Sequence, residues 1–207
     1  MKTGSTQTGQ PKTAPTRCDV KAGGGKSKGA AFERLVCTAL SLWISDGKRD
    51  DLYWRSSMSG GRATVAFKKG GENRTQCGDI TAIHPDGNAL TDRCLISCKF
   101  YQDLKIAGTV TGSTKAGLTS FWLECLEEAK RYNKLPVLIA KQNNVQPFIC
   151  LNDAGVANFQ VKGHYLALLP LGGGVQILWL DRFLKHAVRP GAPGIVRQRP
   201  RIKGRPA

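Results

Sequence analysis

The sequence lacks the features that mark membrane, secreted and zinc-binding proteins. It contains no apolar run near the ~18 residues of a membrane span. Residues 1–17 are polar, so we expect no secretory signal there. Its seven Cys residues form no Cys-x-x-Cys pair and are odd in number, which argues against a zinc site and a disulfide framework. We therefore expect free thiols in a reducing cytoplasm, which would be the host cytoplasm if the protein is viral.

Acidic residues are also scarce. Lys and Arg total 31 against 15 Asp and Glu, which gives a formal net charge of +16. Such an excess of positive charge predicts a polyanionic partner. Nucleic acid is favoured over an anionic membrane because no basic amphipathic helix stands out. A basic protein that is merely soluble is the alternative.

The two ends of the chain differ in composition from its middle. Residues 1–26 have almost no large apolar side chain, so we predict a disordered basic N-terminal arm. Residues 189–207 hold six Lys or Arg residues, four prolines and no acid. They are predicted to form a flexible C-terminal arm that lies along phosphates, with a solubilising tail as the alternative. The folded domain is then expected to span residues 27–188.

Hydrophobic periodicity divides this middle part into helices and strands. We predict helices from Lys28 to the stop at Asp46-Gly47 and over residues 118–132, with a polar loop over 105–115. The turn residues 84–88 predict a hairpin between strands 77–83 and 92–99. Further strands are predicted at residues 53–56, 64–67, 136–140, 147–151, 165–169 and 175–180. This order predicts an α/β fold with helices flanking a mixed central sheet.

The predicted hairpin carries an acid and a lysine near the ends of adjacent strands. Asp79 lies in Gly78-Asp79-Ile80 on one strand, and Lys99 ends Ser97-Cys98-Lys99 on the other. Phosphodiester hydrolysis needs a hard cation, carboxylate oxygens that hold it and a group that steadies the attacking water. The pair therefore supplies part of a hydrolytic site.

Several further residues stand in a recognisable order around this pair. The order is Lys28 to Arg34, with Glu33, at the start of the first helix, then Arg55, Ser57 and Ser59 before Gly60-Gly61, then Asp79 and Lys99. Over roughly residues 28–141 the chain resembles the PD-(D/E)XK nuclease superfamily and is most similar to the archaeal Holliday-junction resolvase group. The resemblance implies a restriction-endonuclease-like core with four strands, Mg²⁺ or Mn²⁺, and cleavage of DNA, including branched DNA, during recombination. It also implies a homodimer, because a symmetric junction requires two cuts.

The same resemblance implies roles for individual residues. Asp79 and the backbone carbonyl of Cys98 would bind the metal, and Lys99 would position or activate water. Glu33 would reach the metal directly or through water, as a third catalytic residue. Residues predicted to contact nucleic acid are Lys28, Arg34, Arg55, Ser57, Ser59, Gln102 and Lys141. A surface glutamine and a solvated strand end are the alternatives for Gln102 and Lys141, and the neighbouring Tyr101 is expected in the core.

One position departs from the family pattern. Ser97 stands where the family has Glu or Asp, so a metal ligand is missing. We predict that the second helix replaces it, with Glu124 as the first choice and Glu128 as the second, because both lie on one flank of its apolar stripe. An ordinary solvated acidic face is the alternative.

Three functions follow from these observations. The first is a metal-dependent DNA endonuclease, such as a junction-resolving or recombination nuclease. The second, motivated by Ser97, is a DNA-binding protein on a nuclease fold that has lost catalysis. The third, motivated by the basic arms, is a structural protein of a virus or mobile element.

Overall fold

The protein is described by a computed structural model that covers residues 25–56, 77–111, 117–161, 163, 165–169 and 174–190. The predicted strand at residues 64–67, Ser57 and Ser59 lie outside the described residues. So does most of each predicted arm, although the first helix already begins at Gly25. The domain limits at residues 27 and 188 therefore stay a prediction.

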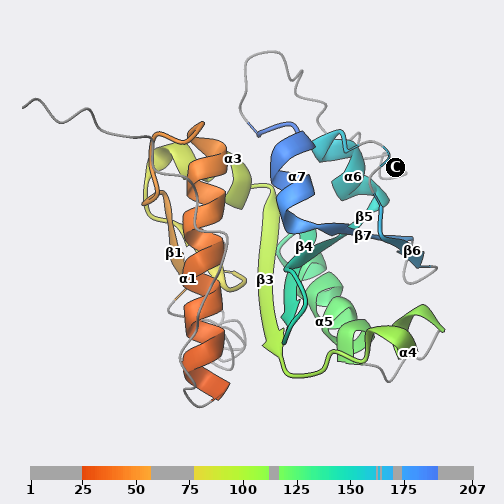
Figure 1. Cartoon of the computed structure of the whole chain (residues 1–207). Coiled ribbons are helices and arrows are strands. Elements are labelled where there is room, and N and C mark those ends of the chain that lie inside the picture. The colour runs from red at the N-terminus through yellow and green to blue at the C-terminus, as the bar shows by residue number, and fades with distance from the viewer. Residues whose placement is uncertain are drawn as a thin grey trace, which may run out of the picture.

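A mixed sheet of five strands forms the centre of the molecule (Figure 1). Its strands are β3 (Cys94–Tyr101), β4 (Leu135–Gln142), β5 (Phe148–Asn152), β6 (Ala167–Leu169) and β7 (Val175–Trp179), in the order β3-β4-β5-β7-β6. The pair β3–β4 is parallel and the other pairs are antiparallel. The predicted α/β class with a flanked mixed sheet is confirmed, and the architecture is consistent with a restriction-endonuclease-like core. This sheet has one strand more than the four that the resemblance implies.

Helix α1 (Gly25–Ile44) covers one face of the sheet. Its buried residues Phe32, Val36 and Leu40 recur every four positions and pack against alternate residues of β3. The helix ends at Ile44, just before the predicted Asp46-Gly47 stop, where both residues have positive φ angles of 57° and 78°. Trp43 in its last turn contacts the rings of Phe159 and Phe183, which lie on α6 (Asp153–Phe159) and α7 (Leu180–His186).

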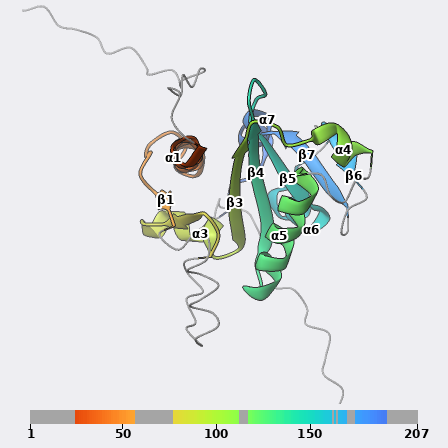
Figure 2. The same ribbon diagram turned by 90° about the horizontal axis from the view of Figure 1, so that it is seen from below.

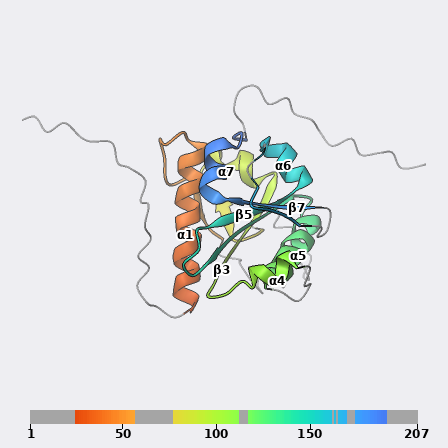
Figure 3. The same ribbon diagram turned by 45° about the vertical axis from the view of Figure 1, so that its right-hand side comes forward.

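Helix α5 (Gly117–Arg131) covers the opposite face, so that β3 lies between α1 and α5 (Figures 2 and 3). Its buried stripe of Leu118, Trp122, Cys125 and Ala129 confirms the helix predicted over residues 118–132. The stripe packs on the face of β3 that carries Leu95. None of the described helices is long and apolar enough to cross a membrane.

The predicted hairpin is wrong. Strand β2 (Ile80–Ala82) pairs with β1 (Tyr53–Arg55) in a separate antiparallel sheet, and β3 pairs with β4 instead. Between β2 and β3 the chain forms a 3₁₀ turn, η1 (Pro85–Gly87), and a short helix, α3 (Asn88–Thr91). The ring of His84 accepts a hydrogen bond from the amide of Asp86, and Pro85 opens the turn, so the same residues that favour a hairpin turn here start a helical one.

Other helices were also missed. Residues 105–115 were predicted as a polar loop, but α4 occupies Ile106–Val110. The helices α4, α6 and α7 have only 5, 7 and 7 residues. So few turns show too little periodicity to be separated from a loop or a strand end.

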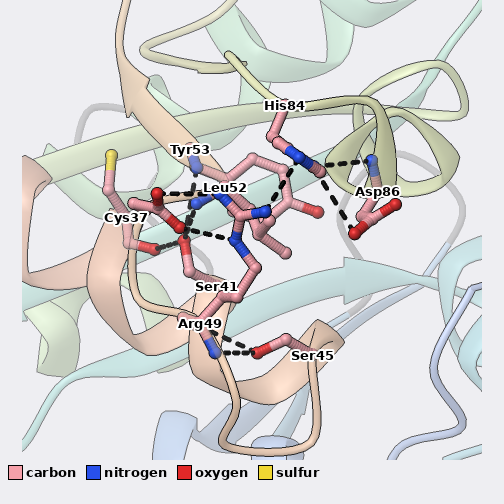
Figure 4. A network of polar contacts seen from close by, with 9 residues as sticks. Cys37, Ser41, Ser45, Arg49, Leu52, Tyr53, His84 and Asp86 are labelled. Atoms are coloured by element: carbon pink, nitrogen blue, oxygen red, sulfur yellow. Dashed lines mark hydrogen bonds and ion pairs between the residues drawn. The ribbon is translucent and has the colours of Figure 1, made fainter.

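A polar network fastens the small sheet to α1 (Figure 4). The buried Ser41 hydroxyl accepts hydrogen bonds from the amides of Leu52 (3.0 Å) and Tyr53 (3.2 Å) and donates one to the carbonyl of Cys37 (2.8 Å). Arg49 lies 2.8 Å from Nε2 of His84, which joins the loop before β1 to the turn after β2. Strand β1 ends at Arg55, and β2 begins directly after Asp79. The network that holds these strands against α1 therefore sets the position of the candidate site.

Replacing Ser41 by Ala is predicted to destabilise the fold. Two buried amides lose their acceptor, so we expect the free energy of unfolding to fall by about 2 kcal/mol or more. Urea denaturation followed by circular dichroism measures this loss. Thr38→Ala, at an exposed position of the same helix, is the matched control. Equal stabilities of the two variants would contradict the role given to Ser41.

Candidate active site

The candidate site lies at the edge of β3 that has no neighbour in the five-stranded sheet. The segment that leads into β2 runs along this edge, where the amide of Asp79 donates to the carbonyl of Ile96 at 2.8 Å. Gly78 has a φ of +75°, and a Cβ at this residue would lie 2.7 Å from the same carbonyl oxygen. The close approach of the two segments therefore requires glycine at residue 78.

The carboxylate of Asp79 is fixed by β3 itself. Its Oδ2 accepts a hydrogen bond of 2.7 Å from the backbone amide of Cys98 and one of 3.2 Å from the hydroxyl of Ser97. Hydrogen bonds to an ionised acceptor are the strong ones, so the side chain has one preferred position. Its other oxygen, Oδ1, accepts no hydrogen bond within the described part of the chain and is left for another ligand.

Lys99 follows Ser97 by two residues and therefore lies on the same face of β3, toward α5. Its Nζ is 3.7 Å from Oε2 of Glu124 and 5.0 Å from the ring centre of Phe121. Both partners come from α5, so this helix holds the amine on the side of the strand where Ser97 meets Asp79.

Glu128, one turn after Glu124, is half-buried on the same helix. Its Oε1 accepts a hydrogen bond of 3.2 Å from the amide of Gly78, directly before Asp79. Burial raises the pKa of the Glu128 carboxyl, and the negative charge of Asp79 raises it further, whereas the Gly78 amide and Lys99 act in the opposite direction. The two carboxylates are therefore close enough to repel each other, and a cation bound by both would relieve this repulsion.

These oxygens fit the metal that the resemblance implies. Mg²⁺ prefers carboxylate oxygens and is commonly bound by one or two of them together with water and substrate phosphate. Asp79 and Glu128 supply such a pair. Across the described ranges no group of three or more His, Cys, Asp or Glu side chains is placed to hold a metal ion.

The two candidate glutamates of α5 have different surroundings. Glu128, the second choice from the sequence, lies beside Gly78-Asp79. Glu124, the first choice, is paired with Lys99, and 65 % of its side chain is exposed. The periodicity of α5 placed both glutamates on one flank of the helix. Only the path of the segment before β2 shows which of them lies beside Asp79.

Glu33 approaches from the other side of β3. It lies on α1 and forms an ion pair with Arg55 of β1. Burial raises the pKa of the Cys98 thiol, and the negative charges of Asp79 and Glu33 both add to this effect. Both acids therefore lie near enough to Cys98 for their negative charge to act on its thiol.

The predicted nucleic-acid contacts are spread over several elements. Arg34 and Gln102 are exposed, and Lys28 is partly exposed near the start of α1. Lys141 on β4 lies over the ring of Phe100, with Nζ 5.6 Å from the ring centre. Arg55 is engaged with Glu33. Sequence reasoning missed Phe121, which contacts the amine of Lys99, because it reads as part of the apolar stripe of α5.

A mixed sheet whose edge strand β3 carries Lys99, and binds the carboxylate of Asp79 from a neighbouring segment, is consistent with the core of a PD-(D/E)XK nuclease. Residues 24–167 match the model of the family described as "Phage putative PDDEXK endonuclease". The match spans more than two thirds of the 207 residues. The chain therefore belongs to this endonuclease family, and the predicted superfamily is confirmed. No curated protein and no solved structure matches the chain at a significant level.

Gly78→Ala is predicted to disturb the site through the backbone. A side chain at a positive φ costs about 1–3 kcal/mol, and the contact with the Ile96 carbonyl forces the segment away from β3. We expect a loss of stability of this size in urea denaturation. Gly29→Ala is the control, because a Cβ there meets nothing within 4 Å and Ala favours the helix. A Gly78→Ala variant as stable as Gly29→Ala would contradict the proposed close approach.

Glu128→Gln is predicted to stabilise the metal-free protein near neutral pH. The raised pKa means that the folded state favours the protonated carboxyl, so the wild-type chain loses stability as pH rises from the ordinary glutamate pKa through the raised one. Gln keeps an acceptor for the Gly78 amide but carries no charge. Thermal melts in a chelator should therefore show an advantage of the variant at neutral pH that disappears in acid. A variant less stable than wild type at neutral pH would contradict this reading.

Proposed function

We propose that the protein is a Mg²⁺- or Mn²⁺-dependent DNA endonuclease that hydrolyses phosphodiester bonds with Asp79, Lys99 and Glu128. One observation carries the proposal. The Asp79 carboxylate is held by the Cys98 amide, and the half-buried Glu128 is bonded to the Gly78 amide directly before it. A hydrolytic metal site requires such a pair of carboxylate oxygens. Lys99 lies on the face of β3 that is turned toward α5, which is the face that carries Ser97 and is covered by the helix of Glu128.

Each residue has a distinct part in the proposed reaction. Asp79 and Glu128, with the carbonyl of Cys98, would hold the cation, which would supply positive charge to offset the charge that develops on the phosphate. Lys99 donates hydrogen bonds that orient the attacking water. Glu124 holds the Lys99 amine in place between turnovers. Glu33 acts from the α1 side through water and keeps Arg55 directed toward the DNA backbone.

Ser97 gives the motif its Ser-x-Lys form. Its hydroxyl donates to Asp79, so the serine positions the metal-binding carboxylate instead of supplying one. Glu128 takes the place of the missing acid from the neighbouring helix. Glu124 is assigned to Lys99, which revises the order of preference drawn from the sequence.

The DNA is proposed to lie across the edge of β3. The phosphate contacts are Lys28, Arg34, Arg55, Gln102 and Lys141, together with Ser57 and Ser59. A net charge of +16 supports this partner, because phosphate neutralisation dominates the affinity of proteins for nucleic acid. The basic arms extend the same contact.

A finer assignment follows from the likeness to archaeal junction resolvases. Branched DNA is the proposed substrate, and two copies of the chain make the paired cuts of recombination. The reaction takes place in a reducing cytoplasm, that of the host if the protein is viral. The six Cys residues of the described part are buried and free, which suits such a compartment.

Two observations favour a second function, a DNA-binding protein without catalysis. Ser97 replaces a family carboxylate, and the amine of Lys99 is paired with Glu124. Such a protein would bind DNA in a chelator, lose affinity steeply with salt and be indifferent to the loss of Asp79.

Cleavage of labelled branched and linear DNA with Mg²⁺ or Mn²⁺ separates the two functions. Asp79→Asn and Lys99→Ala are each expected to slow cleavage by about a hundredfold or more while binding persists. Glu127→Gln, at an exposed position of the same helix, is the matched control and should cleave at the wild-type rate. The proposed nuclease function would be wrong if Asp79→Asn and Lys99→Ala both cleave at the wild-type rate. It would also be wrong if the wild-type chain cleaves none of these substrates.

A further inference from the structure

An exposed aromatic ring stands beside the candidate site. Tyr101, the last residue of β3, was expected in the core, but 46 % of it is exposed. Its ring stacks on that of Phe121 from α5, with the ring centres 4.7 Å apart and the planes inclined by 29°. Phe121 is partly buried against the α5 side of the sheet, so it provides a firm support for the outer ring.

The outer face of Tyr101 is open. Phe121 covers one face of the Tyr101 ring. The Tyr101 hydroxyl forms no hydrogen bond to any of the described residues. A large ring left in water gains nothing from burial and is not held by a polar partner. Its stacking on Phe121 therefore presents a flat π surface to solvent in a fixed orientation.

This surface is adjacent to Lys99. Tyr101 and Lys99 are separated by one residue and point to the same face of β3, about 6.6 Å apart along the strand. The amine of Lys99 lies 5.0 Å from the centre of the same Phe121 ring. One aromatic ring thus contacts both the flat surface and the amine assigned to the water, and a single extended nucleotide can bridge the two.

The surrounding charges favour an anionic ligand with an aromatic group. Lys99 is the neighbour of Tyr101 on this face of β3, and Lys105, four residues after the end of the strand, is exposed. A nucleotide has the matching pair of features, a phosphate for the amines and a base for the ring. Stacking of bases on protein aromatics is a general mode of binding to single strands, because every base has a π face.

We propose that Tyr101, supported by Phe121, stacks an unpaired base next to the phosphate that is cut. The inference rests on the proposed nuclease function and narrows its substrate class. Within a duplex both faces of each base are covered by its neighbours, so Tyr101 reaches a base only in a single strand, a flap or an opened branch point. The enzyme therefore prefers DNA that has an unpaired nucleotide at the cleavage position.

Binding without cleavage tests this most directly. The full chain is titrated, in EDTA, into a labelled single-stranded oligonucleotide and into a duplex of the same sequence. Tyr101→Leu keeps an apolar contact with Phe121 but removes the π face, and we expect it to weaken single-strand binding about tenfold with duplex binding unchanged. Tyr101→Trp should bind the single strand at least as tightly as wild type. Trp54→Ala, at another exposed aromatic that is 55 % exposed on β1, is the control.

A fluorescent base analogue reports the stacking itself. 2-Aminopurine in the single strand should be quenched on binding to wild type and less so on binding to Tyr101→Leu, which a merely structural role of Tyr101 does not predict. Equal weakening of single-strand and duplex binding, or no change in either, would overturn the proposal. If Tyr101 governs single-strand binding but wild type cuts nothing with Mg²⁺ or Mn²⁺, the nuclease function fails and the base-stacking surface stands. If cleavage depends on Asp79 but single-strand binding is unchanged in the Tyr101 variants, the nuclease function stands and the base-stacking surface fails.

Discussion

The hydrogen bond from the Cys98 amide to the carboxylate of Asp79 is the contact on which the account of this protein depends. It joins a segment outside the five-stranded sheet to β3, the edge strand of that sheet, whose Cys98 amide has no partner strand on this side. Glycine at residue 78 permits the approach, and the serine at residue 97 adds a second donor to the same oxygen. A carboxylate held by the backbone in this way keeps its position when substrate arrives, which is what a preorganised hydrolytic site needs.

The site also places two acidic side chains where their negative charges repel each other. Glu128 is half-buried near a second negative charge, and its pKa is raised as a result. A neutral side chain at residue 128 would make the metal-free protein more stable at neutral pH. Strained or repelling groups of this kind are typical of functional sites, where a ligand restores the balance. The neighbouring aromatic pair follows the same logic, since the exposed ring of Tyr101 gains a partner only when something stacks on it.

Much of the architecture could be predicted from the sequence because α1 and α5 are long enough to show a helical period. Local patterns failed where tertiary contacts decide. The residues from His84 to Gly87 suit both a hairpin turn and a 3₁₀ turn, and the pairing of β3 with β4 selects the second. Glu124 and Glu128 share one helix flank, so only the path of the distant segment at Gly78 distinguishes them. The exposure of Tyr101 was equally hidden, because Tyr is intermediate in burial and the sequence alone does not say whether a ring at a strand end meets the core or solvent.

We propose that Asp79 and Glu128 share one divalent cation. Titration of the full chain with Mn²⁺, followed by electron paramagnetic resonance, tests it directly, since Mn²⁺ accepts the same oxygen ligands as Mg²⁺. The account predicts one bound Mn²⁺ per chain, lost in Asp79→Asn, weakened in Glu128→Gln and retained in Glu127→Gln. Binding of Mn²⁺ that is unchanged by both of the first two substitutions would contradict it.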